Sequence, residues 1–195
     1  MKKFLLFIVV IVLVGAFWAV GQYNSLVSGK ANVAQAWSNV QVQYQRRGDL
    51  VPQLVSTVEW AAKFEKSTLT DVVNARAKAT GITVDPTNAK SIADFNAAQT
   101  QLSWALSRLL VSVEAYPDLK ANQNFRDLQS QLEGTENRIG VARGDYNAAA
   151  TGWNVKISRV PTVFVARLFG FEKASLFEAQ SGTENAPKIE FNLDK

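Results

Sequence analysis

The sequence contains neither cysteine nor histidine. Their absence excludes disulfide bonds, thiolate nucleophiles, zinc sites of the usual ligand set and a serine–histidine–aspartate triad. A strong net charge is lacking as well, because Lys2 and Lys3 account for two of the 21 basic residues and 19 basic against 17 acidic residues remain in the body. Basic and acidic residues alternate along the chain instead of forming a basic stripe, so we expect no binding of nucleic acid.

What the chain does have is an apolar segment near its N-terminus. Phe4 to Val20 is uncharged over 17 residues, close to the ~20 residues that a helix needs to cross a bilayer. Basic side chains can reach the headgroups at one end, and aromatic side chains can lie at the other interface. We expect residues 1–22 to be a membrane anchor, with lipid as its partner. Four residues are the expected interface anchors: Lys2, Lys3, Trp18 and Tyr23.

A cleaved signal peptide is the alternative interpretation of this segment. Ala19-Val20-Gly21 offers small residues at the positions that a signal peptidase inspects, and cleavage there would give a mature start at Gln22. The apolar run is longer than the ~7 to 15 residues of a usual signal core, and bulky Phe17 and Trp18 lie near the cut. The length favours a retained anchor.

The basic flanks predict the orientation of the anchor. Lys2 and Lys3 precede the span, whereas only Lys30 follows within the ~15 to 20 residues that count. We therefore expect a single pass, with the N-terminus inside and the body outside the membrane. The expected location is a bacterial inner (cytoplasmic) membrane, with the body on the periplasmic or extracellular side.

Two small residues in the anchor suggest contact between spans. Gly15 and Ala19 form a small-xxx-small pair, which lets two helices approach closely in lipid. We expect a homo-oligomer on this basis; a monomer on a tether is the alternative.

The body, residues 23–180, has the pattern of one all-α domain. Apolar residues at three- and four-residue spacing predict a helix over 23–47. Gly48 and Pro52 then predict a turn or kink, with Asp49 as the N-cap of a second helix that ends at Ala79. The pattern also allows these two helices to be one kinked rod.

Further helices follow a loop at residues 80–87. The third is expected over 88–116, capped by Thr87 or Asp85. A 3-4 heptad stripe predicts a fourth over 121–160, which Pro161 ends. The predicted architecture is an anchor helix that continues into an antiparallel bundle of about four long helices. A short phenylalanine-rich C-terminal segment follows, which includes a short helix to about residue 168. We expect Phe169, Phe171 and Phe177 of this segment to seal one end of the bundle. The tail over 181–195 is expected to be either a short strand or loose.

Several strings carry a resemblance to a known family: YNSLV from Tyr23, AWSNVQVQYQRRGDLVPQLV from Ala36, LEGTENRIGVARGDYN from Leu132, ARLFGF from Ala166 and the Lys-Ile-Glu-Phe of 188–191. Together they resemble the LemA family over nearly the whole chain after the anchor. The resemblance implies a membrane-anchored antiparallel helical bundle. It implies no defined activity.

The polar residues of the predicted bundle do not have the spacing of a catalytic pair. Glu136 and Asp145 lie nine residues apart, which is ~13 Å of helical rise and too far for a glycosidase carboxylate pair. Interhelical ion pairs that fix the register of the helices explain such residues better. The hypothesis is a network in which two residues pair with two others across helices: Arg47 and Asp49 with Glu136 and Arg143.

The sequence thus predicts no catalytic, cofactor-binding or metal-binding residue, no cofactor and no small-molecule substrate, and we expect the protein not to be an enzyme. Two functions remain. One is a scaffold that assembles in the membrane plane and organises membrane or protein. The other is a membrane-tethered adaptor that presents a partner or client to another membrane protein, such as a protease.

Overall fold

The computed structural model describes residues 2–59 and 65–178, and in these ranges every regular element is a helix. The six helices are α1 (Lys2–Glu59), α2 (Lys66–Thr80), α3 (Ala89–Val113), α4 (Pro117–Lys120), α5 (Gln123–Ser158) and α6 (Thr162–Leu168). The expected tail over 181–195 lies outside the described residues.

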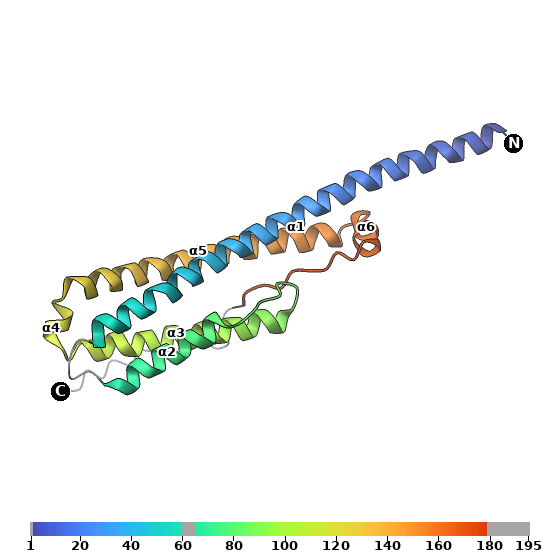
Figure 1. The fold of residues 1–195 in the computed structure, drawn as a ribbon. Coiled ribbons are helices and arrows are strands. Elements are labelled where there is room, and N and C mark those ends of the chain that lie inside the picture. Colours follow the sequence, from blue (N-terminus) through green and yellow to red (C-terminus); the bar gives the residue numbers. More distant parts are fainter. Residues whose placement is uncertain (1, 60–64, 179–195) are drawn as a thin grey trace, which may run out of the picture.

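Four long helices form an antiparallel bundle built from two pairs (Figure 1). α1 packs along α5, and α2 packs along α3, while α1 also contacts α2 and joins the pairs. Short α4 lies at one end of the bundle and short α6 at the other (Figure 1). The prediction of an all-α fold, with an N-terminal apolar helix running into the bundle, is confirmed.

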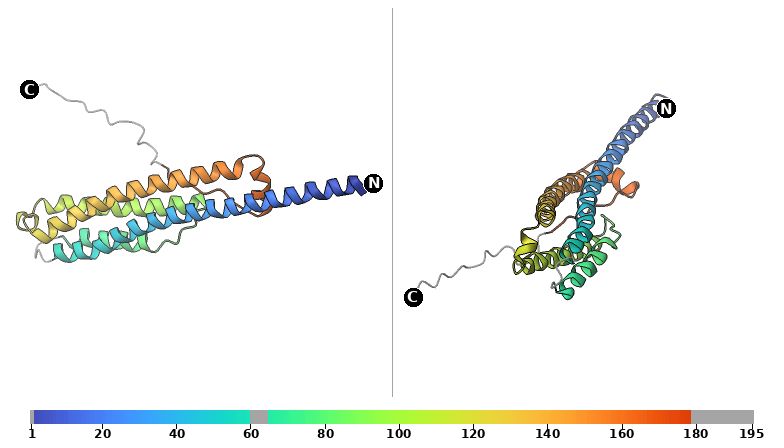
Figure 2. Two further views of the ribbon diagram at one scale, coloured as in Figure 1. Left: turned by 90° about the horizontal axis from the view of Figure 1, so that it is seen from above. Right: turned by 60° about the vertical axis from the view of Figure 1, so that its left-hand side comes forward.

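The first part of α1 projects beyond the bundle (Figures 1 and 2). Its most apolar window has a mean hydropathy of 2.9 and no residue of it is buried in the structure. Length and composition make this segment suitable to cross a membrane. No break in the helix separates the segment from the part that packs in the bundle.

The predicted turn at Gly48 and Pro52 is wrong, and the two predicted helices form one rod, as the alternative allowed. α1 continues through Gly48 and Pro52 to Glu59, so Asp49 caps nothing and lies inside the helix. The residues expected in a second helix are divided between the end of α1 and α2, with residues 60–64 outside the described ranges.

Tertiary contacts explain why the helix survives its proline. Pro52 has no N–H, so the carbonyl of Gly48, four residues earlier, loses its intrahelical donor. Arg76 of α2 replaces that donor, because its Nε donates to the Gly48 oxygen at 2.7 Å. α2 also approaches closely: a Cβ on Gly48 would lie 3.2 Å from the Cγ2 atom of Thr80. Local sequence predicts the break, and packing against α2 removes it.

Smaller differences concern the helix ends. Asn88, not Thr87 or Asp85, caps α3, and its side chain accepts hydrogen bonds from the backbone of Lys90 and Ser91. Asp85 instead accepts from the amide and the hydroxyl of Thr87, which lowers the pKa of its carboxyl group. The predicted third helix ends three residues early, at Val113, and α4 begins at the proline after Tyr116.

The core divides into two clusters along the bundle. The cluster near α4 is mainly aliphatic, and the one near α6 is rich in aromatic residues. The aromatic cluster includes Trp37, Phe95, Tyr146, Trp153 and Phe177. Of the phenylalanines expected to seal this end, Phe177 is buried and Phe171 packs against the cluster, but Phe169 is 55% exposed.

Candidate functional site

Arg47 is the most unusual side chain of the bundle. It lies on α1 and is only 2% exposed, although arginine is almost never buried unless it is paired. It follows Tyr44 on the buried stripe of α1 at a three-residue interval, so helical periodicity directs it inward. The neighbouring Arg46 faces solvent.

Residues of α3 and α5 bind the guanidinium group. One terminal nitrogen of Arg47 donates to the Ser103 hydroxyl at 2.8 Å and to a Glu136 carboxylate oxygen at 2.8 Å. The other donates to the side-chain and backbone oxygens of Gln99, at 2.5 and 3.1 Å. Gln99 in turn donates to the carbonyl of Ala79 at the end of α2. One arginine thereby links all four long helices.

The two charged partners of this centre differ in burial, because Arg47 is buried and Glu136 is not. Glu136 is the acidic partner of Arg47 but is 57% exposed. The guanidinium carbon also lies 5.1 Å from the centre of the Tyr44 ring, a cation–π distance. Burial raises the pKa of Tyr44, an effect that the nearby Arg143 and Arg47 oppose. Tyr44 therefore stays neutral at physiological pH and faces the guanidinium as an uncharged ring.

The arginine centre lies where the two core clusters meet. Arg47, Gln99 and Thr135 are the buried polar residues of the described chain, one on each of three helices. On each helix the core residues before and after this level belong to different clusters: Tyr44 and Leu50, Phe95 and Leu102, Ile139 and Leu132. A slip along the bundle axis would leave Arg47 buried against apolar side chains, so we expect this polar layer to oppose such a slip.

A pocket of about 280 Å³ opens beside this layer. Tyr44, Arg47, Glu136, Arg143 and Trp104 are among the residues that line it. Guanidinium, amide and hydroxyl groups line it together with one carboxylate, that of Glu136, which is paired with Arg47. The Ser103 hydroxyl accepts a hydrogen bond from Arg47 and donates to the carbonyl of Gln99, so no basic side chain holds its proton.

The four residues of the predicted network have different positions. Arg47 and Glu136 form the predicted pair across α1 and α5. Arg143 lines the same pocket, and its guanidinium carbon lies 4.6 Å from the centre of the Phe177 ring. Asp49 does not join them: it is exposed and accepts a hydrogen bond from Gln45 on its own helix. The role of the network in register stays a prediction.

The sequence analysis did not predict a second set of polar contacts on α5. In this set, side chains of α5 hydrogen-bond to the backbone of the extended segment that follows α6. Asn147 and Asn154 each make two hydrogen bonds to the backbone of this segment, at Phe177 and Ala174 respectively. The aromatic residues before them donate as well, Tyr146 to the carbonyl of Ser175 and Trp153 to that of Glu172. A signal was present: within α5 an aromatic–asparagine dipeptide occurs twice, seven residues apart.

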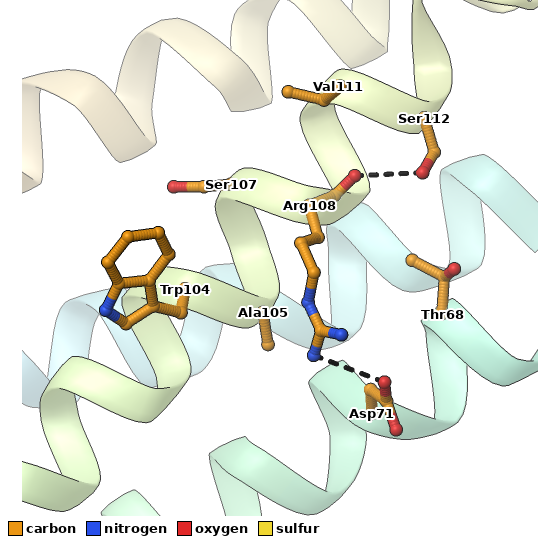
Figure 3. A pocket seen from close by; sticks show the side chains of 8 residues that line it. All are labelled: Thr68, Asp71, Trp104, Ala105, Ser107, Arg108, Val111 and Ser112. Carbon is orange, nitrogen blue, oxygen red and sulfur yellow. Dashed lines mark hydrogen bonds and ion pairs between the residues drawn. The ribbon is translucent and has the colours of Figure 1, made fainter.

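Another pocket lies between α2 and α3 and shares Trp104 with the pocket at the arginine centre (Figure 3). In it Arg108 of α3 donates to the Asp71 carboxylate of α2 at 3.3 Å (Figure 3). Trp104 and Val111 line the pocket and are 67% and 72% exposed.

The predicted anchor residues lie on the N-terminal part of α1. Lys2, Lys3 and Trp18 are exposed, and Tyr23 packs its ring 4.8 Å from that of Phe169. A methyl group added at Gly15 would meet no atom of the bundle within 4 Å, and Ala19 is half-buried.

Residues 36–191 match the LemA family, which is most of the chain. The protein belongs to the LemA family. The resemblance seen in the sequence is thus confirmed, together with the helical bundle that it implies.

Relatives of this LemA-family chain come from several bacteria. Protein LemA of Metamycoplasma hominis is 26% identical over 180 residues, which is 91% of this chain and 80% of the relative. Magnetosome protein MamQ 2 of Paramagnetospirillum magneticum is 27% identical over 176 residues, and magnetosome protein MamQ of Magnetospirillum gryphiswaldense is 26% identical over 175. The chain matches only 65% and 64% of the length of these two magnetosome proteins.

Proposed function

We propose that this protein is a non-enzymatic scaffold that is anchored in the membrane and self-assembles in the membrane plane. The observation that carries the proposal is the continuity of α1. One helix of 58 residues contains both the apolar segment and the helix that packs against α5. Without a hinge between them, the packing angle of two spans also sets the relative orientation of two bundles.

The small residues of the span supply the contact. Gly15 and Ala19 lie one turn apart on the projecting part of α1, where nothing in the bundle covers Gly15. Neighbouring spans that pack through this face bring their backbones close together, which is favourable in lipid. The rods then extend side by side from the bilayer.

The proposed location is the bacterial inner membrane, with the N-terminus inside and the bundle on the periplasmic or extracellular side. The basic flanks of the span support it, since Lys2 and Lys3 precede the span and Lys30 follows it. The natural lack of cysteine makes the test direct. A single cysteine in place of exposed Val141 reacts with an impermeant maleimide in intact cells only if the bundle is outside.

Self-assembly is tested by the mass of the complex after gentle solubilisation from native membranes, with its components identified. A large assembly of this chain alone supports the scaffold. The double variant Gly15→Leu, Ala19→Leu should reduce its mass. The matched control is Ala16→Leu, Val20→Leu, which has the same spacing on a face rotated by ~100° and should leave the mass unchanged. A monomeric wild-type protein would overturn the scaffold.

The adaptor is the second candidate, and the α2–α3 surface in Figure 3 favours it. Exposed Trp104 and Val111 beside the Arg108–Asp71 pair form an apolar patch with a polar rim, as protein interfaces do. Recovery of a stoichiometric second protein, lost on Trp104→Ser substitution, would favour the adaptor over the scaffold.

A further inference from the structure

The membrane-proximal end of the bundle has an apolar outer surface. α6 buries Val165 and Ala166 against the aromatic core cluster. Its opposite side and its flanks are apolar too, although they face solvent. Four large apolar residues there are more than half exposed: Val160 at 77%, Phe164 at 66%, Leu168 at 78% and Phe169 at 55%. An exposed cluster of this size indicates a binding surface.

Two contacts hold this surface beside the part of α1 that directly follows the apolar span. The Thr162 hydroxyl donates to the side-chain oxygen of Gln22 at 3.1 Å, and the ring of Phe169 lies 4.8 Å from that of Tyr23. Figures 1 and 2 show α6 at the end of the bundle from which the N-terminal part of α1 projects.

The thickness of a bilayer then determines what surrounds α6. Gln22 follows Val20, the last apolar residue of the span, by two residues, or ~3 Å of helical rise. The headgroup layer on each side of the hydrocarbon is ~5 to 7 Å thick. A span placed across the hydrocarbon therefore brings α6 to the depth of the headgroups.

The charges around α6 fit the same layer. Between residues 156 and 173 the chain has four basic residues and a single acidic one, Glu172. The basic residues are Lys156, Arg159, Arg167 and Lys173. Arg159 and Arg167 are exposed beside the apolar side chains, where they can bind lipid phosphates while Phe164 and Leu168 enter the acyl boundary.

We propose that α6 and its flanking residues insert into the headgroup layer of the leaflet that α1 leaves, as a second membrane contact that prefers anionic phospholipid. The span alone lets the bundle rotate about α1, whereas a second contact fixes its azimuth and tilt. The inference requires that α1 spans the bilayer, but it does not require self-assembly.

The test uses the full chain in vesicles of phosphatidylethanolamine and phosphatidylglycerol. A single cysteine replaces Phe164 and carries a fluorophore that responds to polarity. The matched control is Val141→Cys, because Val141 is also 66% exposed and lies on α5, ~25 Å from the end of that helix nearest α6. We expect the probe at residue 164 to emit further to the blue and to be quenched by lipids that bear a nitroxide near the headgroup.

Other outcomes overturn the proposal. Equal quenching at residues 164 and 141 means that α6 stays in water. A blue shift at residue 164 without quenching by lipid means that a second copy or another protein covers it. A probe at Val20→Cys distinguishes failure of the anchor from failure of α6 insertion. If the probes at residues 20 and 164 are both unquenched, α1 does not span the bilayer. If the probe at residue 20 is quenched and the one at residue 164 is not, α1 spans the bilayer but α6 does not insert. The pair Arg159→Gln, Arg167→Gln should lower the quenching at residue 164 in vesicles that contain phosphatidylglycerol.

Discussion

The two halves of the bundle are stabilised in different ways. The half near α4 is an aliphatic core of leucine, valine and alanine, with Phe125 as its aromatic member. The half near α6 has interlocking rings: Trp37 lies 5.3 to 5.7 Å from the rings of Phe95, Tyr146 and Phe177. Aliphatic packing tolerates volume-conserving exchange, whereas aromatic edges and faces have preferred geometries.

The aromatic half is also the one attached to the projecting helix. Its extended segment is held on α5 by paired asparagine–backbone hydrogen bonds, which are directional. The relative orientation of the packed elements is thus specified most strongly in the aromatic half, next to the proposed membrane. The polar layer at Arg47 separates this half from the aliphatic half, where the main requirement is that apolar side chains fill the available volume.

The largest expected effect comes from Trp37→Ala. The loss of a buried tryptophan that contacts three rings should lower the free energy of unfolding by about 3–5 kcal/mol. Trp104→Ala is the matched control, because Trp104 is 67% exposed and its loss should change stability by less than about 0.5 kcal/mol. Denaturant titration of the full chain in detergent measures both. A loss for Trp37→Ala no greater than that for Leu54→Ala in the aliphatic half would contradict the comparison.

The boundary between the halves is tested by Arg47→Ala. Removal of the guanidinium should cost about 3 kcal/mol, the lower end for a broken buried pair, because Glu136 is left partly hydrated. Arg46→Ala, next to it on the exposed side of α1, should be nearly neutral. Both are measured by the same titration. If the two substitutions cost the same, the polar layer does not contribute to stability.

In the aliphatic half, Arg76 and Pro52 should be coupled. Arg76→Ala leaves the Gly48 carbonyl without a donor and should cost about 1–3 kcal/mol. In a Pro52→Ala background the new N–H can bond that carbonyl, so the same substitution should cost about 1 kcal/mol less. Lys78→Ala, exposed on the same helix, is the control. Strict additivity in the double-mutant cycle would refute the replacement of the donor.

The remaining effect is a pH dependence in the aromatic half. Burial raises the pKa of Tyr146 from 10.0 to about 12. The unfolded chain releases this proton near pH 10, whereas the folded protein holds it to about 12, so the folded state binds more protons in this window. Stability should therefore be complete below pH 10 and fall as the pH rises from 10 to 12.

Tyr146→Phe provides the comparison for this titration. The variant loses the hydrogen bond to Ser175 and should be less stable at neutral pH, but its stability should fall less steeply between pH 10 and 12. An unchanged slope would assign the alkaline loss to other groups.

Much of this fold was predictable because a helix with one buried face has apolar residues at regular intervals in its sequence. Trp37, Val40 and Tyr44 on α1, and the heptad stripe of α5, appear in the sequence at the spacing that the core requires. The Arg47–Glu136 pair was predictable in kind, since both lie beside apolar stripes. Gln99 and Ser103 were not, because their role depends on α3 being placed against α1 at one particular height.

The sequence alone determined that the chain is helical, that its first segment is apolar enough to cross a membrane and that it resembles the LemA family. Tertiary structure decided the rest. Gly48 and Pro52 would break an isolated helix, and α1 is continuous because α2 supplies the donor that proline lacks. Likewise, no local pattern places Thr162 beside Gln22, 140 positions apart in the chain. Local patterns record which face of a helix is buried, whereas contacts between distant residues depend on how the helices assemble.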